Sequence, residues 1–229
     1  MAAAPNLVLW GVGTSRTVRA HWALAELGLP YETRAIGPRT GETKTVEYTS
    51  LNPRQKIPLL QDGDFSIGES AAIVAYLSRT YSTPERALIP ETQRDYAAWL
   101  EWCFFIVTEL DSTSLYVMRR HGANALGPIY GIAPEVVAKA GEYFREQLRH
   151  VEVALADGRE FLMGERFTSA DILLTTCLDW AIAYGVGICD NAQPYLERMQ
   201  ARPAYQQGKI ANQPPAPGEP VVRPPARCP

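Results

Sequence analysis

The sequence has few of the features that mark membrane, secreted or nucleic-acid-binding proteins. In its 229 residues no apolar run approaches the roughly 20 that a membrane-spanning helix needs. The opening stretch MAAAPNLVLWGVG has neither the basic region nor the continuous apolar segment of a signal peptide. A formal net charge of -3 is spread without a basic stripe, which argues against nucleic acid and anionic membranes as partners. We therefore expect a cytoplasmic protein with no membrane and no nucleic-acid partner.

Cysteine and histidine are also scarce. The four cysteines are widely spaced and form no C-x-x-C pair, and the three histidines are scattered. Metal centres built from these residues need several ligands at short, defined spacings. We therefore expect no metal site, and we expect the cysteines to be reduced thiols.

What is present is a pattern of alternating strands and helices over the first 81 residues. The apolar run 6–12 predicts a strand, and the stretch 14–28 has apolar residues at helical spacing that end at a glycine. A second strand follows at 30–37, then a polar loop, a hairpin around Asp62-Gly63, and a helix from about residue 70. A strand-helix-strand unit followed by a hairpin predicts a small mixed sheet covered by helices.

The rest of the chain has a different character. After a polar connector at 82–92, residues 93–212 show helical periodicity and almost no strand signal. We expect helices at 93–122, 134–157, 169–184 and 193–201. The tail 213–229 has seven prolines among its 17 residues, so we expect it to be extended or disordered. The fold class is thus α/β followed by an all-helical domain.

Two short motifs in the first domain have a structural and a functional interpretation. The proline in Ile57-Pro58 either begins an edge strand, or is a cis-proline that leaves the backbone of the preceding residue free to pair with a ligand. Glu69-Ser70 either caps the helix that follows, or offers a carboxylate for an ammonium group and a hydroxyl for a carboxylate. The second interpretation describes a site for an amino-acid head group.

Thr14-Ser15 separates the first strand from the first helix. The simpler interpretation is a helix N-cap, where threonine and serine are favoured. The functional interpretation places a hydroxyl donor and the positive helix end beside the thiolate of a ligand.

Two features of the helical domain complete the pattern. Thr168 and Asp171 have the spacing of a capping box, which we interpret as structural. The aromatic-rich stretch 95–120 predicts a core helix, in which Tyr116 is a candidate for lining an apolar pocket.

Taken in this order and spacing, the motifs resemble those of cytosolic glutathione transferases over nearly the full length of the chain. The resemblance is carried by SRTVRAHWALAELGLPYE, by NPRQKIPLLQDGDFSIGESAAIVAYL and by FTSADILL. It implies a thioredoxin-like domain at 1–81, a linker at 82–92 and a helical domain with an electrophile pocket at 93–212. It also implies glutathione as the co-substrate, and a homodimer.

The resemblance further implies roles for individual residues. Ile57, before the family's cis-proline at Pro58, would pair with the cysteinyl backbone of glutathione. Glu69 and Ser70 would hold the γ-glutamyl ammonium and carboxylate. Lys56 would face the glycyl end of the tripeptide.

The hydroxyl that stabilises the thiolate is expected from Ser15, because SRTVR keeps a serine four residues before an arginine. Thr14 is the competitor. Cysteine is missing near the first helix and Trp10 stands where Tyr-type classes have a tyrosine, so a Ser/Thr-type site of a bacterial kind is favoured.

One subsite departs from the family pattern. The loop after the second strand has no histidine for the glycyl carboxylate, and Lys44 or Thr43 is the expected substitute.

The function implied is a detoxifying glutathione transferase that directs the thiolate at an apolar electrophile. The alternatives are a glutathione-dependent peroxidase, isomerase or ether-cleaving enzyme on the same fold, or a non-catalytic binding or regulatory relative. A single sequence does not identify the electrophile.

Overall fold

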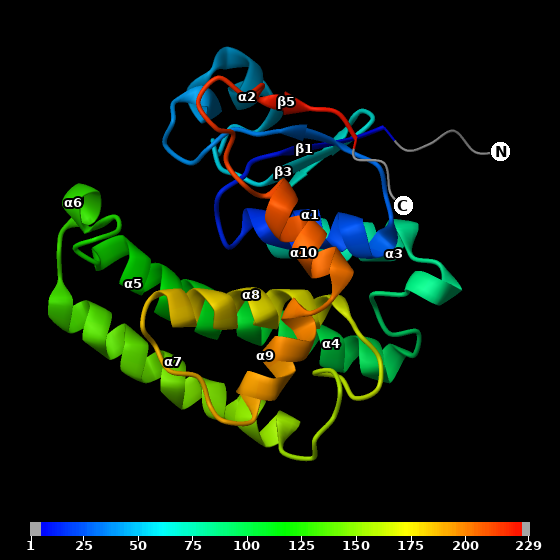
Figure 1. Ribbon diagram of the computed structural model, residues 1–229, viewed down its shortest axis with the longest axis vertical. Coiled ribbons are helices and arrows are strands. Elements are labelled where there is room, and N and C mark those ends of the chain that lie inside the picture. Colours follow the sequence, from blue (N-terminus) through cyan, green and yellow to red (C-terminus); the bar gives the residue numbers. More distant parts are fainter. Residues whose placement is uncertain (1–5, 226–229) are drawn as a thin grey trace. The chain divides into compact units, whose positions relative to one another are not determined.

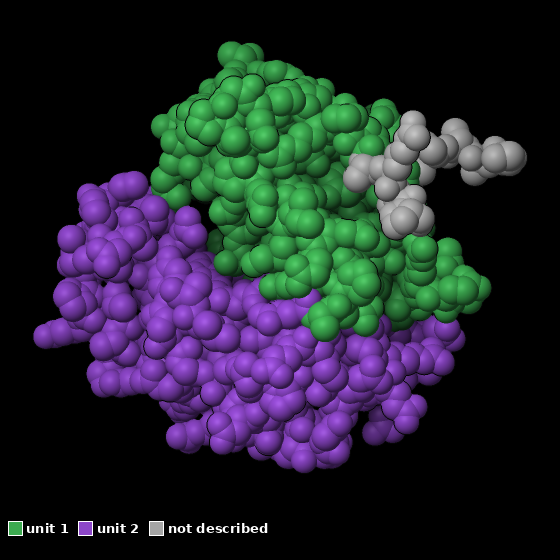
Figure 2. Space-filling model, viewed as in Figure 1, with its two compact units in different colours: residues 1–89, 201–229 green, residues 90–200 purple. Residues whose placement is uncertain are grey.

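The computed structural model describes residues 6–225, which fall into two compact units. Figure 2 shows them in two colours: the first combines residues 1–89 with 201–229, and the second consists of residues 90–200. Within residues 6–225, none of the helices combines the length and the apolar character needed to cross a membrane. That same part of the chain holds no cluster of three or more His, Cys, Asp or Glu side chains suited to a metal ion.

The first unit is a mixed sheet with helices, as the sequence predicts, but the sheet has five strands and its fifth strand was not expected. The strand order is β4-β3-β1-β2-β5; β1 and β2 are parallel, and the other neighbours are antiparallel. Figure 1 shows the sheet with α1, α3 and α10 beside it. Its elements are β1 (Leu7–Trp10), α1 (Thr17–Leu27), β2 (Glu32–Arg34), η1 (Glu42–Lys44), α2 (Val46–Leu51), β3 (Leu59–Asp62), β4 (Phe65–Gly68), α3 (Ser70–Tyr81), η2 (Pro84–Arg86), α10 (Pro203–Ala211) and β5 (Val222–Arg223).

Burial of apolar side chains from α1 and the central strands positions these elements. Leu9 and Leu60, opposite each other on β1 and β3, are fully buried, as is Trp22 on α1. The helix ends at Gly28, whose left-handed backbone (φ 65°) suits glycine. A second small cluster of buried side chains forms where α2 meets the sheet; it consists of Trp10, Ile36, Tyr48 and Leu59.

The second unit is entirely helical in its described elements. Its central helix is α8, which is buried along most of its length and packs against η3, α4 and α9 (Figure 1). The elements are α4 (Gln93–Phe105), the π-helix η3 (Ile106–Leu115), α5 (Tyr116–His121), α6 (Gly127–Tyr130), α7 (Pro134–Leu155), α8 (Ser169–Ala183) and α9 (Ala192–Gln200).

The capping box at the start of α8 is confirmed. Asp171 accepts hydrogen bonds from the backbone N–H of Thr168 and of Leu162, each at 2.8 Å, and from the Tyr195 hydroxyl at 2.8 Å. Burial raises the pKa of this carboxyl group. The buried Asp171 therefore joins the start of α8, the loop before it and α9.

The C-terminal part of the chain differs from the sequence-based expectation in two ways. Residues 203–211 form a separate helix, α10, that belongs to the first unit and not to the helical domain. The described part of the Pro-rich tail, expected to be extended or disordered, includes the extended strand β5, which joins the sheet by pairing antiparallel with β2, with Thr33 opposite Arg223. An edge strand makes hydrogen bonds on one side only, so it tolerates prolines nearby. Residues 226–229 of the tail lie outside the described residues.

Candidate functional site

The loop between β1 and α1 presents two hydroxyl groups, and the structure separates their roles. The Thr14 Oγ1 accepts a hydrogen bond from the backbone N–H of Thr17 at 3.0 Å and lies 2.9 Å from the Thr17 Oγ1. It therefore satisfies one of the N–H groups that the first turn of α1 leaves unpaired. Thr14 acts as the cap of this helix.

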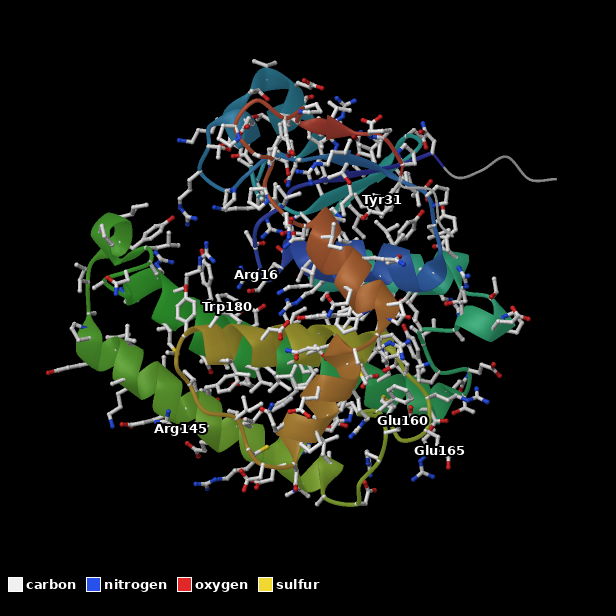
Figure 3. All side chains as sticks on the ribbon, in the orientation of Figure 1. Arg16, Tyr31, Arg145, Glu160, Glu165 and Trp180 are labelled. Carbon is white, nitrogen blue, oxygen red and sulfur yellow. The ribbon has the colours of Figure 1, made fainter. Side chains whose placement is uncertain are left out.

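The Ser15 hydroxyl is in a different situation. The side chain is half-buried, and none of the hydrogen bonds within the described residues uses its oxygen. Arg16, which follows it at the start of α1, is labelled in Figure 3. A hydroxyl with no protein partner beside a helix N-terminus is available to donate to an anion.

A second part of the site is the loop before β3. The Lys56 carbonyl oxygen accepts hydrogen bonds from the Tyr48 hydroxyl at 2.5 Å and from the Asn52 Nδ2 at 2.8 Å. The Ile57-Pro58 peptide bond that follows is cis. Within the described residues, no hydrogen bond uses the N–H or the C=O of Ile57. This backbone is therefore held in place and free to pair with an extended ligand.

Gly11, at the end of β1, allows the loop before β3 to come close to the β1–α1 loop. It has φ 113°, and a Cβ added there would lie 2.6 Å from the Ile57 Cβ. A side chain at position 11 would displace Ile57, so the glycine fixes the distance between the β1–α1 loop and the residue before the cis-proline.

The third part of the site is the start of α3. Ser70 is buried, and its Oγ accepts a hydrogen bond from the Nη1 of the buried Arg19 at 3.2 Å. Because a guanidinium group only donates, the Ser70 oxygen is the acceptor and its own proton remains for another partner. The first N–H groups of α3 add a partial positive charge at this place. The geometry suits a bound carboxylate.

Glu69, next to Ser70, has an unusual backbone. Its φ is 65°, a left-handed value that costs a residue other than glycine about 1–3 kcal/mol. Its side chain does not cap α3 and instead pairs with Arg54 at 2.6 Å. Both side chains are more than half exposed, so this ion pair contributes at most about 1 kcal/mol, and a ligand ammonium group could replace Arg54.

The two lysines of the predicted site are exposed. Lys56 belongs to the loop before the cis-proline and Lys44 ends η1, and within the described residues neither ammonium group has a hydrogen bond or an ion pair. Thr43, the other candidate in η1, is buried. Tyr116 lies in the second unit, where it is half-buried at the first position of α5, directly after the π-helix.

A buried histidine supports the β1–α1 loop from inside. The His21 Nε2 lies 3.1 Å from the Gly11 carbonyl oxygen, and its Nδ1 lies 2.8 Å from the hydroxyl of Tyr31, which Figure 3 labels. Since a carbonyl only accepts, the Nε2 carries the proton and Tyr31 donates to the Nδ1. Burial lowers the pKa of His21 to about 4, so the ring is neutral at neutral pH.

Comparison with known proteins identifies the family to which this chain belongs. The sequence pattern of the glutathione S-transferase N-terminal domain matches residues 5–79, and that of the C-terminal domain matches residues 134–207. The human glutathione S-transferase theta-2B is 30% identical over 76% of this chain and 70% of its own. This chain belongs to the glutathione S-transferase family.

Other family members extend the comparison. Glutathione S-transferase 1 of Schizosaccharomyces pombe is 31% identical over 66% of this chain, and the match spans 64% of that protein's length. The theta-class glutathione S-transferase of Xanthomonas axonopodis pv. citri, solved with glutathione bound, is 27% identical with a TM-score of 0.78, over 90% of this chain and 98% of that one. The fold predicted for the family, a mixed-sheet domain and a helical domain, is confirmed.

The structure adds residues to the candidate site that the sequence motifs do not reveal. Arg19 appears in the sequence only as a spacing marker, and its burial, which for an arginine implies a polar partner, is visible only in the structure. Tyr48 and Asn52, which hold the Lys56 carbonyl, lie in a stretch that the sequence predicts as a loop. Their roles depend on contacts that no local pattern contains.

Proposed function

We propose that this protein binds glutathione in its first unit and presents the sulfur as a thiolate to an electrophile. The observation that carries the proposal is the Ser15 hydroxyl at the start of α1, which has no protein partner in the described structure while the neighbouring Thr14 hydroxyl is used as a cap. Family membership and the glutathione-bound Xanthomonas relative support the choice of ligand.

In the proposed complex each part of the tripeptide meets one part of the site. The cysteinyl backbone pairs with the N–H and C=O of Ile57, before Pro58. The γ-glutamyl carboxylate accepts from the Ser70 hydroxyl and from the start of α3, and its ammonium group pairs with Glu69. The glycyl carboxylate meets Lys56 and Lys44, whose exposed ammonium groups have no other partner in the described structure.

The chemistry required of Ser15 is modest in energy. A free thiol has a pKa of about 8.5, and lowering it by two units requires roughly 2.7 kcal/mol of preferential binding of the thiolate. One hydrogen bond to an ion supplies roughly 1.5–3 kcal/mol, and the helix end adds some tenths of a kcal/mol. The thiol proton leaves to solvent, the sulfur forms a bond to the electrophilic carbon, and the displaced group departs with its electron pair.

The partner substrate is proposed to be a small apolar electrophile, with Tyr116 as a pocket residue. The support is local: Tyr116 directly follows η3, and π-helical segments are rare and frequently lie at functional sites. We further propose a detoxifying role in the cytoplasm and a homodimeric state. The free thiols of Cys103, Cys177 and Cys189 are consistent with a reducing compartment.

The direct test is calorimetric titration of glutathione into the protein. We expect micromolar to low-millimolar affinity, and in a Glu69→Ala, Ser70→Ala variant a loss of about two orders of magnitude or more, because two charge-assisted contacts disappear. Glu165→Ala, which removes an exposed carboxylate in the second unit (Figure 3), should bind like the wild type. Wild-type protein that gives no heat and no thermal shift at saturating glutathione would show the proposal to be wrong.

A further inference from the structure

The C-terminal part of the chain returns to the loop that holds Ser15. We propose that Asn212 is a positioning residue, which fixes this loop so that the Ser15 hydroxyl can reach the sulfur of a bound thiol. The inference rests on the proposed function, because it concerns the same loop. It assigns a role in the chemistry to a residue that follows α10, far along the chain from the first helix.

Three hydrogen bonds join Asn212 to the residues on both sides of Ser15. The backbone N–H of Gly13 donates to the Asn212 carbonyl oxygen at 2.8 Å. The Asn212 Nδ2 donates to the Thr14 carbonyl oxygen at 3.2 Å. The Thr17 hydroxyl donates to the Asn212 Oδ1 at 2.6 Å. One asparagine thus holds the loop before Ser15 and the helix after it.

These contacts also fix the directions of the protons in the loop. The Thr14 carbonyl can only accept, so the amide of Asn212 must turn its Nδ2 toward Thr14 and its Oδ1 toward Thr17. The Thr17 hydroxyl lies 2.6 Å from the Asn212 Oδ1 and 2.9 Å from the Thr14 carbonyl oxygen. Both of these oxygens only accept, so the Thr17 proton is directed to them and the Thr14 hydroxyl is left to donate to the Thr17 oxygen, 2.9 Å away. The Thr14 proton is then committed within the protein, which leaves Ser15 as the donor available to a ligand.

The tail also packs against this loop directly. Gly13 has φ 80°, and a Cβ added to it would lie 3.1 Å from the Cγ of Pro214. The loop and the tail are therefore in close contact at a position where the backbone already favours glycine.

Asn212 is itself held firmly from both directions. Before it, α10 packs on α1: the Trp22 and Tyr205 rings are 5.0 Å apart, and Arg202 forms an ion pair with Glu26 at 2.7 Å. Figure 1 shows α10 lying across α1.

After Asn212, the chain returns to the sheet as β5. Arg223 in this strand donates through its Nη1 to the carbonyl oxygens of Gln213 at 3.0 Å and of Ala211 at 3.4 Å. The residues on both sides of Asn212 are thus tied to a strand of the first unit, which makes Asn212 a rigid support.

The test compares Asn212→Ala with Gln213→Ala, which removes the neighbouring exposed side chain. We expect Asn212→Ala to raise the pKa of the bound glutathione thiol, followed by its ultraviolet absorbance, by about one unit, with about a tenfold fall of kcat/KM below that pKa. The acidic limb of the pH profile of kcat/KM should move with it. Glutathione affinity should change little, because the Ile57 and Glu69-Ser70 subsites are intact. Gln213→Ala should match the wild type.

A second pair of variants separates positioning from general stability. Thr17→Ser keeps the hydroxyl and should keep the wild-type thiol pKa, whereas Thr17→Val should behave like Asn212→Ala. If Asn212→Ala lowers only the melting temperature and leaves the thiol pKa and the pH profile unchanged, the positioning role is wrong. If wild-type protein itself binds glutathione without lowering the thiol pKa, the proposed role of Ser15 fails and this inference fails with it.

Discussion

The Nη1 of Arg19 donates to the Ser70 hydroxyl oxygen at 3.2 Å and so joins the middle of α1 to the first residue of α3. Both side chains are buried. The guanidinium occupies the oxygen as a donor, so the serine proton is directed to another acceptor. In the proposed complex that acceptor is the γ-glutamyl carboxylate, and Arg19 orients the hydroxyl without contacting the ligand.

Replacing Arg19 should therefore weaken glutathione binding. We expect Arg19→Met, which keeps much of the apolar stem, to raise the Kd about tenfold, since a hydrogen bond to a charged group contributes roughly 1.5–3 kcal/mol and part of it would survive. Titration calorimetry measures this change. Arg79→Met, at an exposed position of α3, is the matched control.

A double-mutant cycle identifies the route of this effect. If Arg19 acts through Ser70, then Arg19→Met should add little to the loss of affinity already caused by Ser70→Ala. Additive losses would show that Arg19 affects the site in some other way, and an unchanged Kd in Arg19→Met would contradict the orienting role.

Ser15 and Thr14 should respond differently to removal of their hydroxyl groups. Ser15→Ala should return the pKa of bound glutathione toward about 8.5, the value of a free thiol, with stability unchanged. Thr14→Ala should lower the free energy of unfolding by about 1 kcal/mol, as the loss of a helix cap does, and shift the thiol pKa less. Ultraviolet titration of the complex and chemical denaturation measure the two quantities. The opposite pattern would exchange the roles assigned to these residues.

His21 should make stability depend on pH in a defined window. Its pKa is lowered by burial from 6.5 to about 4, with the nearby positive charge of Arg223 acting in the same direction. Between these values the unfolded chain binds a proton that the folded protein does not, so its contribution to stability is complete above about pH 6.5 and falls as the pH drops toward 4. The decrease in the free energy of unfolding attributable to His21 should be about 3 kcal/mol.

The contribution of His21 is isolated by comparing the free energy of unfolding of the wild type with that of a variant without this histidine. The free energy of unfolding of wild-type protein minus that of His21→Gln should decrease from pH 6.5 to pH 4, because only the wild type has this titrating group. A difference for His21→Gln that stays constant over the window would contradict the pH dependence assigned to the buried ring.

The sequence predicts the sheet of the first unit well because local patterns determine it. Leu9 and Leu60 lie in short apolar runs, Asp62-Gly63 marks the hairpin, and Gly28 ends α1 where a left-handed residue is required. The capping box of α8 is equally local, since Thr168 and Asp171 are three residues apart. In each case the information lies within one element and its ends.

The C-terminal elements could not be predicted in the same way. α10 has helical periodicity, but its place beside α1 depends on side chains from opposite ends of the sequence, and β5 is a two-residue strand in a Pro-rich segment. The candidate site likewise combines residues that local motifs reveal with residues that only distant contacts reveal. Glu69-Ser70 and Thr14-Ser15 are visible as motifs, whereas Arg19 contacts a residue 51 positions away and Asn212 one 198 positions away.

Gly208 offers a stringent test of where α10 packs. A glycine-to-alanine change inside a helix ordinarily stabilises it by about 1 kcal/mol. Here the added Cβ would lie 2.8 Å from the Trp22 Cα and 2.9 Å from its backbone nitrogen, and backbone atoms in the buried α1 cannot turn aside as the end of a flexible side chain can. We therefore expect Gly208→Ala to lower the free energy of unfolding by about 1–3 kcal/mol, the usual cost of overpacking, measured by chemical denaturation. Gly187→Ala meets nothing within 4 Å and should be close to neutral.

Because Asn212 follows α10 directly, the same Gly208→Ala protein should also show a raised pKa of the thiol of bound glutathione. A Gly208→Ala protein as stable as the wild type would mean that α10 does not pack against α1 in this way.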